Sequence, residues 1–134
     1  MMRCSLNDLI DNFGLLDDWE ARYGYLIELG KGLPPMADDL KTDETFVRGC
    51  TSRVWMVAET GEGGHIHFTA DSDAHIVRGL ISILLCAYQD KMPAEIKAID
   101  IEDVFARIGL DQHLSPNRRN GFFAMVERIK TLAA

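Results

Sequence analysis

Residues 53–70 decide the fold of this chain, and they read RVWMVAETGEGGHIHFTA. Residues 53–59 are rich in amino acids that favour β-structure, and apolar and polar residues alternate over 65–70, as they do in strands with one buried face. The glycine-rich run 60–64 between them is typical of a hairpin loop. The stretch therefore predicts a hairpin of two strands. On the first strand Val54, Met56 and Ala58 are expected to share one face, and on the second strand Ile66, Phe68 and Ala70 are expected to point one way.

Helical patterns lie on both sides of this hairpin. Apolar residues recur at helical spacing over 5–13, 18–29 and 73–89, and in the last of these they are dense enough to predict a largely buried helix. Asp17 is expected to cap the second helix and Gly30 to end it. The acidic run Asp71-Ser72-Asp73 is interpreted as capping and dipole stabilisation at the start of the third helix.

The remaining segments complete an α+β pattern. Pro93 opens a short helix, 101–107 form another, and Ser115 with Pro116 starts a final helix. A short third strand is expected at 45–48. The order predicts one domain over 1–134, in which a small antiparallel sheet of about three strands carries helices on one face.

Composition excludes several classes of function. The chain has 134 residues, of which 21 are acidic and 14 basic, and its formal charge is −7. This charge argues against nucleic acid and against an anionic membrane surface as partners. The apolar run 79–87 is too short to span a bilayer, and the N-terminus has no apolar core of a signal peptide. We therefore expect a cytoplasmic protein.

Cys50 is the candidate reactive group. Gly49 and Ser52 place it in a loop directly before the hairpin. Arg48 and Arg53 flank it, and nearby cations favour a thiolate over a thiol. The residue alone leaves two interpretations open, a reactive thiol and a small buried hydrophobic residue.

The sequence gives weaker evidence of a role for the other cysteines, the histidines and the arginines. The three cysteines, Cys4, Cys50 and Cys86, have no disulfide or zinc spacing, and Cys86 is expected in the core. His65 and His67 share a strand face but lack a visible third ligand, so we assign no metal site. Arg118 and Arg119 lie in the first turn of the last helix, against its dipole; an anionic partner, a buried carboxylate or simple solvation would explain them.

With these residues in view, the chain resembles the SufE-type sulfur acceptors. The similarity runs over nearly its whole length, from Trp19, Arg22-Tyr23 and Leu33-Pro34 to Leu114-Ser115-Pro116, Arg118 and Gly121. Its most specific part is Val47-Arg48-Gly49-Cys50-Thr51-Ser52-Arg53-Val54-Trp55, followed by Asp71-Ser72-Asp73-Ala74. Thr51 departs from the pattern, because glutamine is more usual there.

The resemblance implies a specific role. Proteins of this family activate a cysteine desulfurase of the SufS type, which depends on pyridoxal phosphate, and take its persulfide sulfur onto one cysteine. They pass the sulfur to an iron–sulfur scaffold of the SufB type. By position the acceptor is Cys50, and Arg118 supports the thiolate or the partner contact. The resemblance assigns this chain no cofactor, no metal and no stand-alone enzymatic activity, and it leaves a monomer or a homodimer open.

Three alternatives remain open. A CsdE-type acceptor would serve a different desulfurase paralogue, and a regulatory module would stimulate a desulfurase without taking sulfur. An IscU-like scaffold shares the implied fold but holds a cluster with several cysteines, whereas this loop has only Cys50. We further expect Cys50 to be partly sheltered in the free protein by apolar residues such as Trp55, since a persulfide is easily lost to reductants.

Overall fold

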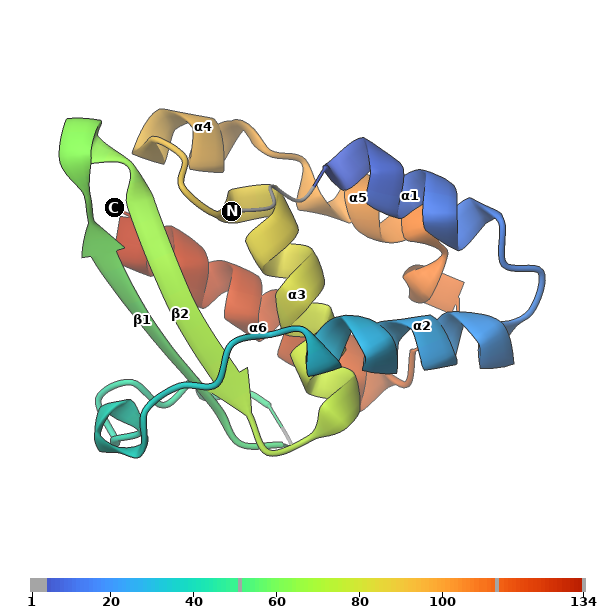
Figure 1. The fold of residues 1–134 in the computed structure, drawn as a ribbon, viewed down its shortest axis with the longest axis horizontal. Coiled ribbons are helices and arrows are strands. Elements are labelled where there is room, and N and C mark those ends of the chain that lie inside the picture. Colours follow the sequence, from blue (N-terminus) through green and yellow to red (C-terminus); the bar gives the residue numbers. More distant parts are fainter. Residues whose placement is uncertain (1–4, 51, 113, 134) are drawn as a thin grey trace.

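The computed structural model describes residues 5–50, 52–112 and 114–133 of the chain. Two helices precede an antiparallel hairpin and four follow it (Figure 1). The elements are α1 (Leu6–Gly14), α2 (Trp19–Lys31), β1 (Val54–Thr60), β2 (Ile66–Ser72), α3 (His75–Tyr88), α4 (Pro93–Ala98), α5 (Ile101–Ile108) and α6 (Pro116–Ala133), with short 3-10 turns at Asp38–Leu40, Glu62–Gly64 and Leu110–Gln112.

The hairpin forms as predicted, and the residues expected to share a face within each strand do so. β1 pairs with β2 from Val54 opposite Ser72 to Thr60 opposite Ile66. The alternate apolar side chains that the sequence assigned to one face are buried, except that Ala58 is half-buried. α3 packs against β2 and α6 against β1, so the hairpin lies along one side of the helical layer, as Figure 1 shows. The predicted α+β class is confirmed.

The third strand is the part of this prediction that differs. Among the described residues the sheet has two strands, and the segment before Cys50 forms only an isolated bridge, Phe46 to Trp55. Val47 N–H donates to the Val54 carbonyl and Met56 N–H to the Thr45 carbonyl, each at 2.8 Å. Turns directly before and after this bridge leave no room for a longer ladder.

Helices α2 and α3 pack closely because glycines remove side chains between them. A Cβ on Gly30 would lie 2.8 Å from the Gly79 nitrogen, and one on Gly79 would lie 2.7 Å from the carbonyl carbon of Leu26. Gly30 therefore allows α2 and α3 to pack closely. The prediction that it ends α2 is wrong, because the helix continues to Lys31. The predicted cap is also displaced by one residue, since Asp18 rather than Asp17 accepts from the helix backbone.

The acidic run at the end of β2, Asp71-Ser72-Asp73, does not cap α3, contrary to the sequence-based interpretation. Ala74 occupies the N-cap position without a side-chain cap. Asp71 is instead buried, at 3% exposure, and pairs with the Arg78 guanidinium. It also accepts from the backbone N–H of Met36 at 3.1 Å and lies 3.5 Å from the Lys41 ammonium. The carboxylate thereby joins the end of β2, the start of α3 and the segment after α2.

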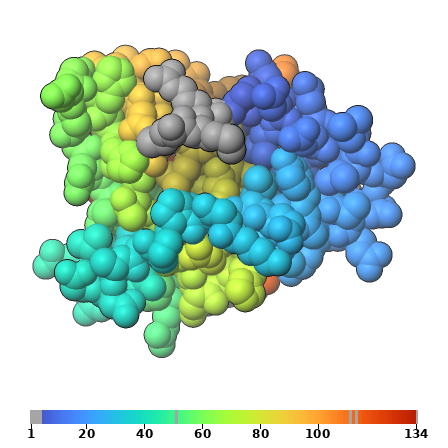
Figure 2. Space-filling model, in the orientation of Figure 1, coloured from blue at the N-terminus to red at the C-terminus, as the bar shows by residue number. Residues whose placement is uncertain are grey.

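That segment lies across the front of the molecule. In the space-filling view the chain that follows α2 crosses over α3 (Figure 2). Arg78 holds it there by donating to the carbonyls of Gly30 at 3.2 Å and Leu33 at 2.6 Å. No helix of the described residues is long and apolar enough to cross a membrane.

Candidate functional site

The loop that carries Cys50 is fixed at both of its ends. On its N-terminal side Val47 is paired with Val54. On its C-terminal side Arg53 N–H donates to the Asp73 carboxylate at 3.1 Å, and the Ser72 hydroxyl donates to the Arg53 carbonyl at 2.6 Å. These bonds fix where the loop begins and ends, and they explain what Ser72 and Asp73 do in place of capping.

Gly49 sets the path of the loop just before the thiol. Its φ of +96° lies in the region that residues with a side chain rarely adopt. A Cβ at this position would also lie 3.1 Å from the Ala124 Cβ on α6. The glycine therefore lets the loop turn while it is close to α6.

The Cys50 thiol faces α6 and is half-buried. Its Sγ donates to the Gly121 carbonyl at 3.4 Å. Gly121 makes this approach possible, because even a Cβ there would lie only 3.4 Å from the sulfur. Burial raises the pKa of the Cys50 thiol. At neutral pH the resting group is therefore a protonated thiol.

A small cavity of about 10 Å³ adjoins the sulfur, about the size of one water molecule. Polar residues of its lining come from the loop and the first turns of α6, and apolar residues come from α3 and α6. They are Ser52, Asn117 and Arg118 on the polar side, and Val77, Leu80, Gly121, Phe122 and Met125 on the other. The structure thus brings together the two residues that the sequence selected, Cys50 and Arg118.

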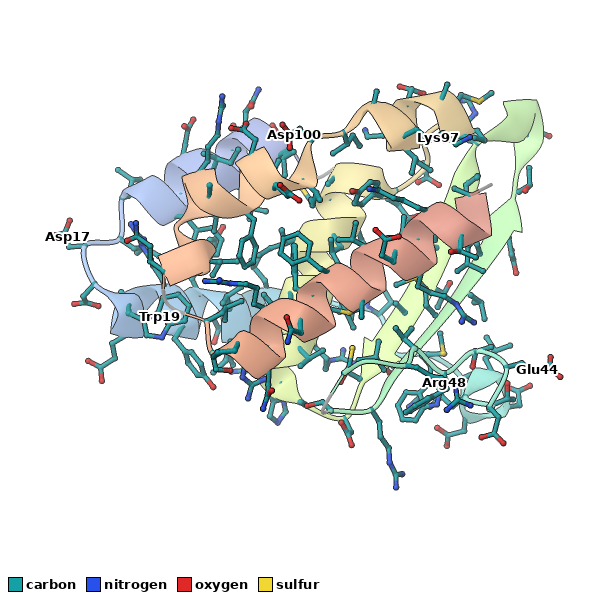
Figure 3. All side chains as sticks on the ribbon, turned by 180° about the vertical axis from the view of Figure 1, so that it is seen from behind. Asp17, Trp19, Glu44, Arg48, Lys97 and Asp100 are labelled. Carbon is teal, nitrogen blue, oxygen red and sulfur yellow. The ribbon has the colours of Figure 1, made fainter. Side chains whose placement is uncertain are left out.

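Several other predicted neighbours do not reach this cavity. Trp55, expected to help shelter the thiol, does not line this cavity; its ring packs edge-on to Phe46 with centroids 6.3 Å apart. Arg48 and Arg53 do not line the cavity either. Figure 3 shows Arg48 and Glu44 toward the same edge of the molecule, at the lower right of the view.

The two strand histidines have local partners and lie away from Cys50. His67 Nδ1 lies 2.9 Å from an Asp90 carboxylate oxygen, and His65 Nδ1 lies 3.2 Å from the Glu62 carbonyl. Within the described ranges no group of three or more histidine, cysteine or acidic side chains is placed to hold a metal ion.

Cys50 is the free cysteine of the described residues. Cys86, expected in the core, is half-buried in α3 against the core and is disulfide-bonded, contrary to the expectation from the cysteine spacing. Cys4 and Thr51 lie outside the described residues.

Sequence reasoning alone gave no role to Gly121 and Asn117, the α6 residues beside Cys50. Gly121 lies inside α6, where glycine costs about 1 kcal/mol of helix stability relative to alanine. A glycine at such a position is a signal that another segment packs closely against the helix there. Asn117 carries no such signal, because an exposed asparagine in the first turn of a helix is ordinary. Asn117 lies far from Cys50 in the sequence. Only the fold shows that both residues line the same cavity.

Comparison with known proteins assigns the chain to a family. The family model described as SufE, the Fe-S metabolism associated domain, matches residues 7–133. This chain belongs to the SufE family. The family is one of sulfur transfer in iron–sulfur metabolism and is associated with cysteine desulfurases.

Individual relatives agree with the family match. Two proteins named as uncharacterized SufE-like proteins, from Rhizobium etli and Rhizobium meliloti, are each 48% identical to this chain. The matches cover 97% and 96% of the chain and 90% and 94% of the relatives. The fold resembles the solution structure of a hypothetical protein from Thermus thermophilus, with a TM-score of 0.76 and 20% identity over 99% of this chain and 96% of that one.

Proposed function

We propose that Cys50 accepts sulfur from the persulfide of a SufS-type cysteine desulfurase and relays it to an iron–sulfur scaffold of the SufB type. The observation that carries the proposal is a free, half-buried thiol that follows a glycine with positive φ and lines a small cavity together with Arg118. In this role the chain is a sulfur carrier and an activator of its partner, and it catalyses no reaction alone.

The transfer is a thiol exchange with a persulfide in place of a disulfide. Cys50 gives up its proton, and its thiolate attacks the outer sulfur of the desulfurase persulfide. A new S–S bond forms on Cys50 as the old one breaks, and the leaving group is the desulfurase thiolate. One S–S bond replaces another, so the thiol and the persulfide together are neither oxidised nor reduced. The step therefore needs no external oxidant or reductant.

The resting position of Cys50 protects the sulfur but slows this attack. Because burial raises the thiol pKa, the thiolate fraction is lower than that of an exposed cysteine. Contact with the desulfurase would therefore have to move Cys50 away from the Gly121 carbonyl. Arg118 lines the same cavity as the sulfur, and we propose that its guanidinium supports the thiolate or contacts the partner.

Mass spectrometry after mixing with desulfurase and cysteine tests the proposal. One added sulfur atom is expected on Cys50 and none in the Cys50→Ala variant. Sulfur acceptance that survives this substitution would refute the assignment. Arg118→Lys should retain more transfer than Arg118→Ala, because lysine keeps the charge.

Two controls separate the remaining candidates. A regulatory module would still stimulate the desulfurase as Cys50→Ser, whereas a carrier would lose turnover. Anaerobic reconstitution with iron and sulfide would colour a scaffold, and we expect no colour here. Assays against each desulfurase paralogue separate a SufS partner from the partner of a CsdE-type acceptor.

A further inference from the structure

A second and larger hollow lies on the other side of α6 from Cys50. Its volume is about 150 Å³, and it is formed by the α4–α5 junction, the first turn of α5 and the C-terminal half of α6. Figure 3 shows α6 passing between Asp100, which marks this junction, and the loop that carries Arg48. Nothing in the sulfur-transfer chemistry uses this hollow, which we call the α5–α6 groove.

The floor of the α5–α6 groove is apolar and partly open. Ile101 and Val126 are buried, whereas Ile99 and Phe123 are only partly covered. The Phe123 ring packs edge-on to Phe105 and Phe122, with centroids 5.3 Å away in both cases. These contacts fix the ring, so a ligand in the groove would meet a rigid aromatic surface.

The rim of the groove is acidic. Asp100, Glu102 and Glu127 are exposed carboxylates of its lining, and Lys130 is the basic residue among them. None of these three carboxylates forms an ion pair with another described residue. Asp100 already accepts from the Asp103 N–H as the cap of α5, but Glu102 and Glu127 are available to a cation.

Size and chemistry together indicate one class of occupant. The volume lies below the roughly 300–1,000 Å³ of pockets that hold drug-sized ligands, and it suits a single side chain. A guanidinium on an aliphatic stem matches both parts of the site, since its stem covers apolar surface and its planar head stacks on an aromatic ring and pairs with carboxylates. Arginine is also the charged residue most enriched among the energetic anchors of protein interfaces.

The position of the groove indicates which partner supplies that side chain. On α6, Gly121 faces Cys50, and residues 123, 127 and 130 project to the opposite side at about 100° per residue. A helix with its side chains is only about 10–12 Å thick. An ordinary interface buries about 800 Å² on each partner, which is wide enough to cover Cys50 and reach across one helix.

Resting on the proposed function, we infer that the α5–α6 groove receives an arginine side chain of the same cysteine desulfurase that delivers sulfur to Cys50. The groove is then a second anchor of that complex, and it acts on affinity rather than on the transfer step. Three of the four charged residues in the groove lining are acidic, which favours approach of a cationic surface to this side of the molecule.

Paired variants test the inference in the full-length protein. Glu102→Gln with Glu127→Gln removes two rim charges, and Glu59→Gln with Glu62→Gln removes two exposed charges on the hairpin. Titration calorimetry with the desulfurase should show Kd raised about tenfold by the groove pair and changed less than about twofold by the hairpin pair. At saturating protein, the rate of sulfur transfer to Cys50 should match that of the unchanged chain.

The outcomes separate this inference from the proposed function. If both pairs weaken binding equally, or if the groove pair binds as the unchanged chain does, the groove is not the anchor and the inference is overturned. If the groove pair alone weakens binding but Cys50 gains no sulfur in the unchanged chain, the groove inference stands and the sulfur-carrier role fails. A charge reversal, Glu127→Lys, should weaken binding further than Glu127→Gln does.

Discussion

Replacing Asp71 by asparagine should destabilise the fold more than any exposed substitution in this chain. The carboxylate is 3% exposed and accepts from the N–H groups of Met36 and Ser72, at 3.1 and 2.8 Å. It also pairs with Arg78 and lies 3.5 Å from Lys41. Asparagine keeps the shape but removes the charge, so Arg78 is left largely buried without its counter-ion.

The expected loss follows from that unpaired cation. Removing one partner of a buried ion pair costs about 3–5 kcal/mol. Arg78 keeps its bonds to the Gly30 and Leu33 carbonyls, and its side chain retains 17% exposure. The low end, about 3 kcal/mol, is therefore expected, which for a domain of this size corresponds to a fall in Tm of about 10–15 °C.

The pH dependence of this loss gives a second readout. Burial alone opposes ionisation of Asp71, but the two N–H donors and the cations Arg78 and Lys41 outweigh it and lower its pKa. Stability from a lowered pKa is present above the unfolded value of about 3.9 and is lost as pH falls through the folded value. The difference between the two proteins should therefore be constant from about pH 7 down to about 5 and shrink below about 4.

Urea unfolding followed by circular dichroism measures both quantities. Arg78→Met supplies the matched control, because Asp71→Asn with Arg78→Met should cost less than the sum of the single changes if the two residues act as a pair. A loss below about 1 kcal/mol at neutral pH, or additive single changes, would show that the carboxylate is solvated and that the reasoning is wrong.

Three further predictions concern the glycines and the thiol. Gly79→Ala should cost about 1–3 kcal/mol in thermal melting, because its Cβ would overlap the Leu26 carbonyl; an unchanged Tm would contradict the close packing of α2 and α3. Gly121→Val should raise the rate of Cys50 alkylation by iodoacetamide several-fold, since a Cβ at this position would already lie 3.4 Å from the sulfur and the larger side chain displaces it; a slower rate would show that the thiol exits elsewhere. Because burial raises the Cys50 pKa, alkylation of the native protein should reach half its maximum at a higher pH than in the urea-unfolded chain, and coinciding profiles would refute shelter of the thiol.

The sequence predicted those parts of the fold that local patterns determine. The hairpin faces, the buried helix α3 and the start of the last helix at Pro116 follow from periodicity and capping, and they appear as expected. The short pairing at Phe46 could not be predicted, because the number of residues that join a sheet depends on where turns on both sides place the backbone. Gly30 shows the same limit, since a helix-ending glycine and a glycine at a helix contact look alike until the neighbouring helix is placed.

The acidic run at the end of β2 shows why sequence patterns alone identified only part of the site. Asp71, Ser72 and Asp73 match a capping pattern well, yet their partners are Arg78 and the backbone at Met36 and Arg53. Those partners come from α3, from the segment after α2 and from the Cys50 loop. A local rule finds such residues but assigns them to the nearest helix, because it has no access to segments that only the fold brings together.

The bonds around Cys50 differ in strength in a way that suits a thiol with two positions. A thiol is a weak hydrogen-bond donor, so the contact to the Gly121 carbonyl is easily broken. The ends of the loop are held by conventional bonds at Val47, Arg53 and Asp73, each worth about 0.5–1.5 kcal/mol. A partner can therefore move the thiol by turning the backbone at Gly49 without disturbing the hairpin. Asp73→Ala should remove one of these attachments and raise the alkylation rate of Cys50 in the free protein, while Asp73→Asn, which retains an acceptor for the Arg53 N–H, should leave it close to that of the unchanged chain. Equal rates in all three proteins would show that the loop moves independently of its attachment to β2.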